Sequence, residues 1–126
     1  AVSIDRNEQH LREAKEKVRQ LREAFWQNVK VVGSGNDLNS ELEKANRVAD
    51  FLELGELMLE DAIMRDESAG CHYRSDHVTD EGEAKRDDEH FAFAAAWEYQ
   101  GPEEAVKLYK EWFSFENVKL TQRSYK

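Results

Sequence analysis

The spacing of apolar residues in the first third of the chain most strongly constrains its fold. They recur three or four positions apart, at Leu11, Ala14, Val18, Leu21, Phe25 and Val29. This spacing places them along one face of a helix, with charged and amide side chains on the other. The pattern predicts a long amphipathic helix over about residues 4–29, with Ser3 as a candidate N-cap.

A second long helix is predicted over about residues 40–66, where Ser40 and Glu43 have the spacing of a capping box. From Phe51 to Met64 the residues are apolar on more than one side, which is typical of a helix that is buried on more than one side. A glycine within a helix costs roughly 1 kcal/mol of stability relative to alanine. The presence of Gly55 therefore predicts that another segment packs closely against the helix at this position. Two antiparallel helices therefore need a further partner, either the rest of this chain or another domain.

The last third of the chain has the pattern of a β ribbon. Aromatic residues occupy odd positions, at Phe91, Phe93, Trp97 and Tyr99, and this period of two indicates a strand. After a break at Gly101-Pro102, strand-like residues return from Trp112 to Leu120, although residues 102–112 alternatively fit a short helix that begins at the proline. The predicted fold class is mainly α: an antiparallel long-helix bundle with a C-terminal two-stranded β ribbon over about residues 90–120.

Residues 67–89 form a polar linker that contains the candidate chemical groups. Cys71, His72, His77 and His90 lack the spacing of a zinc site. Two kinds of chemistry remain open from the residues alone: a thiolate at Cys71 with a neighbouring histidine as base, and acid–base chemistry at Asp87 and Asp88. A lone cysteine of this kind is more often inert, and paired carboxylates more often cap a helix or pair with arginine. We therefore assign no catalytic, cofactor-binding or metal-binding residue.

Composition excludes several classes of partner. A net charge of −9 argues against binding to nucleic acid or to an anionic membrane surface. No apolar run approaches the roughly 20 residues that span a bilayer, so direct membrane insertion is not expected. The single cysteine permits no intrachain disulfide, which fits a reducing compartment. These features predict an acidic cytoplasmic domain.

Three runs of residues carry a family resemblance: RDESAGCHYRSDH at 65–77, RDDEHFAFAAAWEYQG at 86–101 and FENVKLTQRSYK at 115–126. Together with the helix sequences REAFWQNVKV and LEKANRVADFLELGELM, they resemble the C-terminal region of the flavoprotein subunit of succinate dehydrogenase and fumarate reductase, in its bacterial form. Ala69 departs from the pattern, since many members carry arginine there.

The resemblance implies a C-terminal domain whose upstream FAD-binding and capping domains are absent from these residues. The full-length subunit would bind FAD, interconvert succinate and fumarate, and pass electrons to an iron–sulfur subunit. Partner subunits would hold it at the inner face of the cell membrane. No cofactor and no catalysis are expected of this fragment alone, because the family's catalytic motifs lie upstream.

The polar linker is then expected to dock the domain on its neighbours, since paired arginine and carboxylate groups fix the register of a buried contact. The residues predicted for this role are His72, Arg74, Asp76, Arg86, Asp87 and Asp88. Two alternatives stay open: a free-standing helical protein–protein interaction module, or the tail of the related L-aspartate oxidase, which the β ribbon fits poorly.

Overall fold

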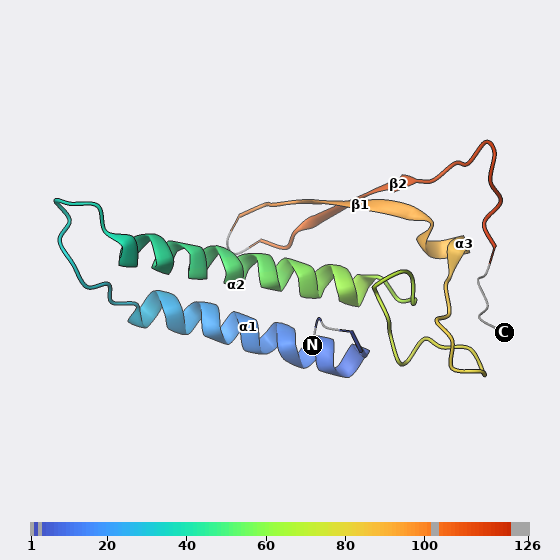
Figure 1. Ribbon diagram of the computed structural model, residues 1–126, viewed down its shortest axis with the longest axis horizontal. Helices are drawn as coiled ribbons and strands as arrows, with labels where there is room; N and C mark the ends of the chain where they lie inside the picture. The colour runs from blue at the N-terminus through green and yellow to red at the C-terminus, as the bar shows by residue number, and fades with distance from the viewer. Residues whose placement is uncertain (1, 3, 102–103, 122–126) are drawn as a thin grey trace.

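The computed structural model describes residues 2, 4–101 and 104–121. Two long antiparallel helices form its body, α1 (Glu8–Asn28) and α2 (Ser40–Met64). The short helix α3 (Asp88–Phe91) leads into strand β1 (Phe93–Glu98), which pairs antiparallel with β2 (Lys107–Trp112). The ribbon lies along α2, on the side away from α1 (Figure 1). The predicted fold class is confirmed.

The two long helices begin at asparagine caps. The Asn7 side chain accepts from the backbone N–H of His10 at 2.9 Å, so α1 starts at Glu8, four residues later than predicted. Ser3 lies outside the described residues. The Asn39 side chain accepts from the N–H groups of Glu41 and Leu42, so the N-cap of α2 is Asn39. The N-cap therefore precedes the predicted Ser40 by one residue, and Glu43 does not stand at the capping-box position relative to Asn39.

The helices meet through a small apolar core and a row of ion pairs. Leu11, Leu59 and Ala62 are buried, and Val2, Ala14, Val18 and Ile63 pack against them. Further along the helix pair, Glu56 is a charged residue on the side of α2 that faces α1. It binds Arg19 at 2.5 Å and Arg22 at 2.9 Å. Glu60 pairs with Lys15 in the same row. Charge pairing therefore continues the helix contact where apolar packing ends.

The second strand differs from its prediction. Residues 107–112 form β2, whereas most of the predicted second strand, from Phe113 to Leu120, is not in a strand. Residues 107–112 are not helical either; Pro102 and residue 103 lie outside the described residues. Cross-strand contacts explain the register, because Phe93 lies opposite Trp112 with their ring centroids 5.1 Å apart, and Lys110 lies over the Phe93 ring.

Long polar side chains attach the ribbon to α2. The indole N–H of Trp97 donates to Asp61 at 2.8 Å. Arg65, at the end of α2, donates to the carbonyl oxygens of Phe91 and Phe93 at 3.0 and 3.1 Å, and its guanidinium lies 5.0 Å from the centroid of the buried Phe93 ring. A two-stranded ribbon is marginal alone, so these anchors hold it in place.

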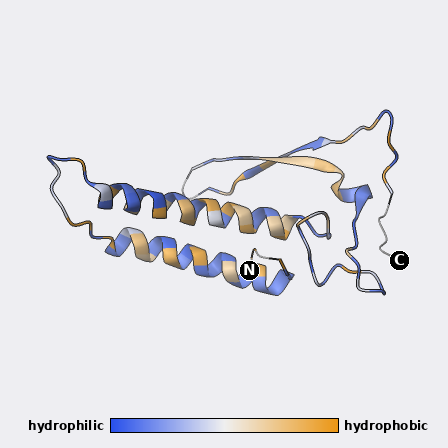
Figure 2. Cartoon of the chain, in the orientation of Figure 1, coloured by the Kyte–Doolittle hydropathy of each residue, from blue (hydrophilic) through white to orange (hydrophobic). Residues whose placement is uncertain are grey.

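Much apolar surface remains exposed in this fold. Figure 2 shows that the hydrophobic residues of α2 gather towards its C-terminal end, while its first turns are largely hydrophilic. Several of its larger side chains face solvent, including Phe51, Leu54 and Met58. Within the described ranges, neither long helix is apolar over the length that a membrane span requires. Contiguous exposed apolar surface of this kind is typical of contacts with another protein surface.

The apolar core makes a testable contribution to stability. Leu59 is 3% exposed, so Leu59→Ala removes buried methyl groups and leaves a cavity. We expect the free energy of unfolding to fall by about 2–3 kcal/mol, measured by urea denaturation. Leu21→Ala is the matched control at a position that is 58% exposed, and we expect it to change stability by less than about 0.5 kcal/mol. Equal losses in both variants would contradict this account of the core.

Candidate functional site

The polar linker is folded around a buried carboxylate at the end of α2. Glu67 is 3% exposed; one of its oxygens accepts from Arg65 at 2.9 Å and the other from the backbone N–H of Asp87 at 2.8 Å. Beside it, the N–H of Ser68 donates to the carbonyl of Lys85 at 2.9 Å. These bonds bring the two ends of the linker together. Glu67 is not among the six predicted docking residues, because a spacing of two from Arg65 is not a helical ion-pair pattern.

Arg74 lies at the centre of the linker and is fully buried. Its Nε and one terminal nitrogen each donate to an oxygen of Asp76 at 2.7 Å, and Asp66 lies 3.2 Å from the guanidinium. Its backbone exchanges hydrogen bonds with the Ser68 hydroxyl. The other terminal nitrogen is buried and has no hydrogen-bond acceptor among the described residues. The bidentate pair fixes the loop geometry around it.

Asp76 links this pair to the start of α1. Its second oxygen also accepts from the backbone N–H of Glu8 at 2.9 Å, at the helix N-terminus. The Arg74 guanidinium beside it holds the pKa of the Asp76 carboxyl well below its usual range, with a further contribution from the Glu8 N–H. Arg6 and Arg74 also form a backbone bridge, with Arg6 N–H to Tyr73 carbonyl at 3.1 Å. The residues before α1 are therefore held by the linker and are not helical.

His72 is buried close to three arginines, Arg6, Arg74 and Arg65. Its Nδ1 lies 2.7 Å from an Arg6 guanidinium nitrogen, which is always a donor, so Nδ1 accepts and Nε2 donates to the carbonyl of Arg65 at 2.8 Å. Burial lowers the pKa of the ring, and the neighbouring arginine charges lower it further. The neutral ring thus joins the end of α2 to the segment before α1, and neither of its nitrogens faces Cys71.

Arg86, Asp87 and Asp88 lie at the surface of the linker. Arg86 donates to both oxygens of Asp88, at 2.7 and 2.5 Å, and to the carbonyl of Thr121 at 3.3 Å. Asp87 caps α3 by accepting from the N–H of His90 at 3.2 Å. An open polar hollow lies here, lined by Asp66, His77, Lys85, Arg86, Asp87, Asp88 and Glu89.

The six predicted docking residues therefore fall into two groups. His72 and Arg74 are buried and bonded within the chain, and Asp76 binds Arg74 and α1. Arg86, Asp87 and Asp88 keep roughly a third of their side chains accessible, at 29%, 41% and 35%. Docking by these residues stays a prediction, and the second group presents the side chains that a neighbour can reach.

The other chemical candidates are not brought together into a reactive site. Cys71 is exposed, and the Nε2 of His77 lies 2.7 Å from Asp66. Across residues 2, 4–101 and 104–121, no group of three or more histidine, cysteine or acidic side chains is placed to hold a metal ion. The arrangement holds backbone segments in register and supplies charged groups at one surface.

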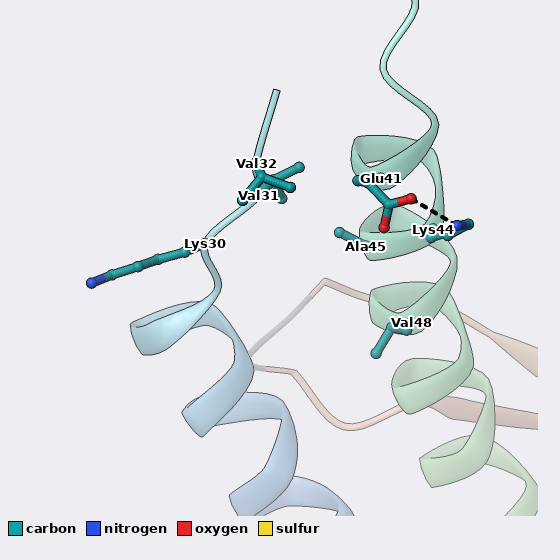
Figure 3. A pocket seen from close by; sticks show the side chains of 7 residues that line it. All are labelled: Lys30, Val31, Val32, Glu41, Lys44, Ala45 and Val48. Carbon is teal, nitrogen blue, oxygen red and sulfur yellow. Dashed lines mark hydrogen bonds and ion pairs between the residues drawn. The ribbon is translucent and has the colours of Figure 1, made fainter. Parts of the chain in front are cut away.

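A second hollow lies at the far end of the helix pair, where the end of α1 and the first turns of α2 diverge (Figure 3). Val31, Val32, Ala45 and Val48 form its apolar lining, and the Lys30 side chain points away from α2. Glu41 and Lys44 pair with each other at 2.7 Å. With no converging polar groups among its lining residues, this hollow lacks the features of a site for a polar ligand.

Comparison with known proteins identifies the class. The family model described as fumarate reductase flavoprotein C-terminus matches residues 1–125. The chain belongs to this family, which consists of oxidoreductase flavoproteins. The match confirms the family resemblance found in the sequence. No curated protein matches the sequence significantly.

Solved structures show the same fold. A structure of E. coli quinol fumarate reductase FrdA carrying a point mutation is 23% identical and aligns with a TM-score of 0.77. A structure of quinol-fumarate reductase with menaquinol molecules is also 23% identical, with a TM-score of 0.74. The alignments cover 94% and 93% of this chain, but only 19% of each matched chain. The chain therefore spans about a fifth of the length of these relatives.

The lowered pKa of the Asp76 carboxyl predicts how the stability of the fold depends on pH. Because its pKa is lower in the folded chain than in the unfolded chain, its stabilisation is present above the unfolded pKa of about 3.9 and is lost as the pH falls through the folded pKa. We expect Asp76→Asn to lower the urea midpoint at pH 7, with the difference from wild type shrinking below about pH 4. Asp80→Asn, at an exposed loop position, serves as the control. A deficit that persists unchanged at low pH would rule out the ion pair as its cause.

Proposed function

We propose that this chain is the C-terminal helical domain of an FAD-dependent flavoprotein that interconverts succinate and fumarate. The family match over residues 1–125 is the observation that carries this proposal. The matched chains are about five times as long, which leaves room upstream for a flavin-binding domain and a capping domain. The full subunit passes electrons to an iron–sulfur subunit and is held at the inner face of the cell membrane by its partners.

The cofactor belongs to the part of the subunit outside this chain. The glycine-rich segment here, Gly33 to Gly35, lies in the loop between α1 and α2. It lacks the strand-to-helix turn that cradles a dinucleotide phosphate. The described residues therefore do not fit FAD, and we assign none of them to the cofactor or to the dicarboxylate.

The domain's own role is structural. The linker holds the end of α2, the start of α1 and the ribbon in register, through Glu67, Asp76 and Arg65. Arg86, Asp87 and Asp88 then face the neighbouring domain or the iron–sulfur subunit. Arginine–carboxylate pairs suit such a contact because they are directional and tolerate partial desolvation.

Cofactor content and activity test the assignment. The full-length subunit is expected to purify with flavin absorbance and to reduce a dye in the presence of succinate. The 126-residue chain alone is expected to show neither property, because its residues build no cofactor site. Measurable turnover by the chain alone would contradict this placement of the active site. A reading frame that starts just before Ala1 and lacks a flavin domain would favour a free-standing interaction module.

Substitutions in the linker separate docking from catalysis. In the full-length subunit, Arg74→Ala leaves Asp76 and Asp66 without their cation, and we expect a loss of stability on the order of 3 kcal/mol. Asp88→Ala frees the partly exposed Arg86 and is expected to cost less, about 1 kcal/mol. The KM for succinate is expected to stay unchanged in both variants. A raised KM at unchanged thermal stability would place these residues near the substrate.

A further inference from the structure

The residues that precede α1 are bonded to the linker at several atoms. We call residues 4–7 the entry segment. The backbone N–H of Arg6 donates to the carbonyl of Tyr73 at 3.1 Å, and the carbonyl of Arg6 accepts from the N–H of Ser75 at 2.8 Å. The His72 ring adds a side-chain contact, with its Nδ1 2.7 Å from an Arg6 guanidinium nitrogen. The entry segment is therefore held both by its backbone and by the side chain of Arg6.

A proton on His72 changes its two hydrogen bonds differently. Nδ1 carries the lone pair that accepts from Arg6, whereas Nε2 already donates to the carbonyl of Arg65 at 2.8 Å. Protonation turns Nδ1 into a second donor, so that an imidazolium N–H faces a guanidinium N–H that also carries a positive charge. The bond to Arg6 is then lost, and the bond to Arg65 is kept.

Each element packed against the ring brings a positive charge. Arg6 belongs to the entry segment, Arg65 to the end of α2 and Arg74 to the linker. Burial and these arginine charges lower the pKa of His72. The nearby carboxylates bind two of the guanidinium groups: Glu67 binds Arg65, and Asp66 and Asp76 bind Arg74. Because Arg65 and Arg74 are held by these pairs, a proton on the ring is accommodated by movement of Arg6.

The acidic group that binds the start of α1 does not titrate in the same pH range. The Arg74 guanidinium beside Asp76 holds the pKa of that carboxyl well below its usual range, so the bond from the Glu8 N–H persists in mild acid. The pKa of His72 is lower in the folded chain than in the unfolded chain. Stabilisation by the neutral ring is therefore present above the unfolded pKa of about 6.5 and is lost as the pH falls through the folded pKa.

We propose that His72 is a pH-sensitive contact that releases the entry segment in acid. A proton at Nδ1 separates Arg6 from the ring and loosens residues 4–7, while the end of α2 and the ribbon stay in place. The contacts involved lie within this chain, so the proposal goes beyond the proposed function and does not depend on an upstream domain.

Hydrogen exchange of the intact protein, followed by mass spectrometry of its peptides, tests this proposal. We compare about pH 5.5 with about pH 7.5, after correction for the pH dependence of intrinsic amide exchange. The amide of Arg6 is expected to exchange about tenfold or more faster at the lower pH, because the segment that protects it opens locally. The ribbon peptide over Phe93–Glu98 is the internal control and is expected to keep its rate. An unchanged rate at Arg6, or an equal acceleration in the ribbon, would overturn the proposal.

Substitution of His72 identifies the titrating group. In His72→Gln, the amide can accept from Arg6 and donate to the Arg65 carbonyl but takes up no proton, so we expect the acceleration to disappear. His10→Gln is the matched control, because the Nδ1 of His10 lies 2.8 Å from the amide nitrogen of Asn7 in the entry segment. This control is expected to retain the acceleration. If the acceleration survives His72→Gln, another group causes it and the proposal is wrong.

A second variant covers the case in which His72→Gln does not fold. Arg6→Gln removes the guanidinium charge, and its amide oxygen can accept from the protonated Nδ1. We expect the entry segment of this variant to exchange at similar rates at both pH values, although His72 still titrates. A response as large as that of the wild type would show that repulsion between His72 and Arg6 does not release the segment, which contradicts the proposal.

Discussion

The ion pair between Arg65 and Glu67 holds together the parts of this domain that are far apart in the sequence. Arg65 binds the carbonyl oxygens before and at the start of β1, while Glu67 binds the backbone N–H at the cap of α3. Both side chains are largely buried, with 19% and 3% exposed. Removing either partner would leave a buried charge unsatisfied, which costs several times more than an exposed pair contributes. The position of the ribbon on α2 depends on this pair.

Polar groups replace apolar packing over much of the domain. The largest fully buried side chains are those of Arg74, Phe93 and Leu11. Arginine is rarely buried unless it is paired, and here Asp76 and Asp66 supply the partners. The neutral His72 ring allows three arginines, Arg6, Arg74 and Arg65, to lie close to it without adding a further positive charge. Directional bonds of this kind specify a single loop geometry, and they complement a helix pair whose apolar core contains only a few residues.

The periodic parts of the sequence predicted the fold well, and the irregular part did not reveal its contacts. Spacings of three and four located both long helices, and the alternating aromatic residues located β1, because each pattern reflects one buried face. The second strand was predicted too late in the chain because the aromatic residues after Trp112 have the pattern of a strand. The actual pairing depends on Trp112 lying opposite Phe93. The sequence did not reveal that Asp76 binds the N-terminus of α1, 68 residues away, in addition to Arg74. Long-range contacts of this kind leave no local pattern.

The hydrogen bond from the Glu8 N–H to Asp76 also has a consequence for the order in which contacts form during folding. The ion pairs between the two long helices join residues 34 to 45 positions apart, whereas this bond joins residues 68 positions apart. Closing a long loop carries an entropy cost that must be met before the contact stabilises the chain. During synthesis, the first turn of α1 therefore gains its bond to Asp76 only after residue 76 has left the ribosome, long after the residues of α1 itself.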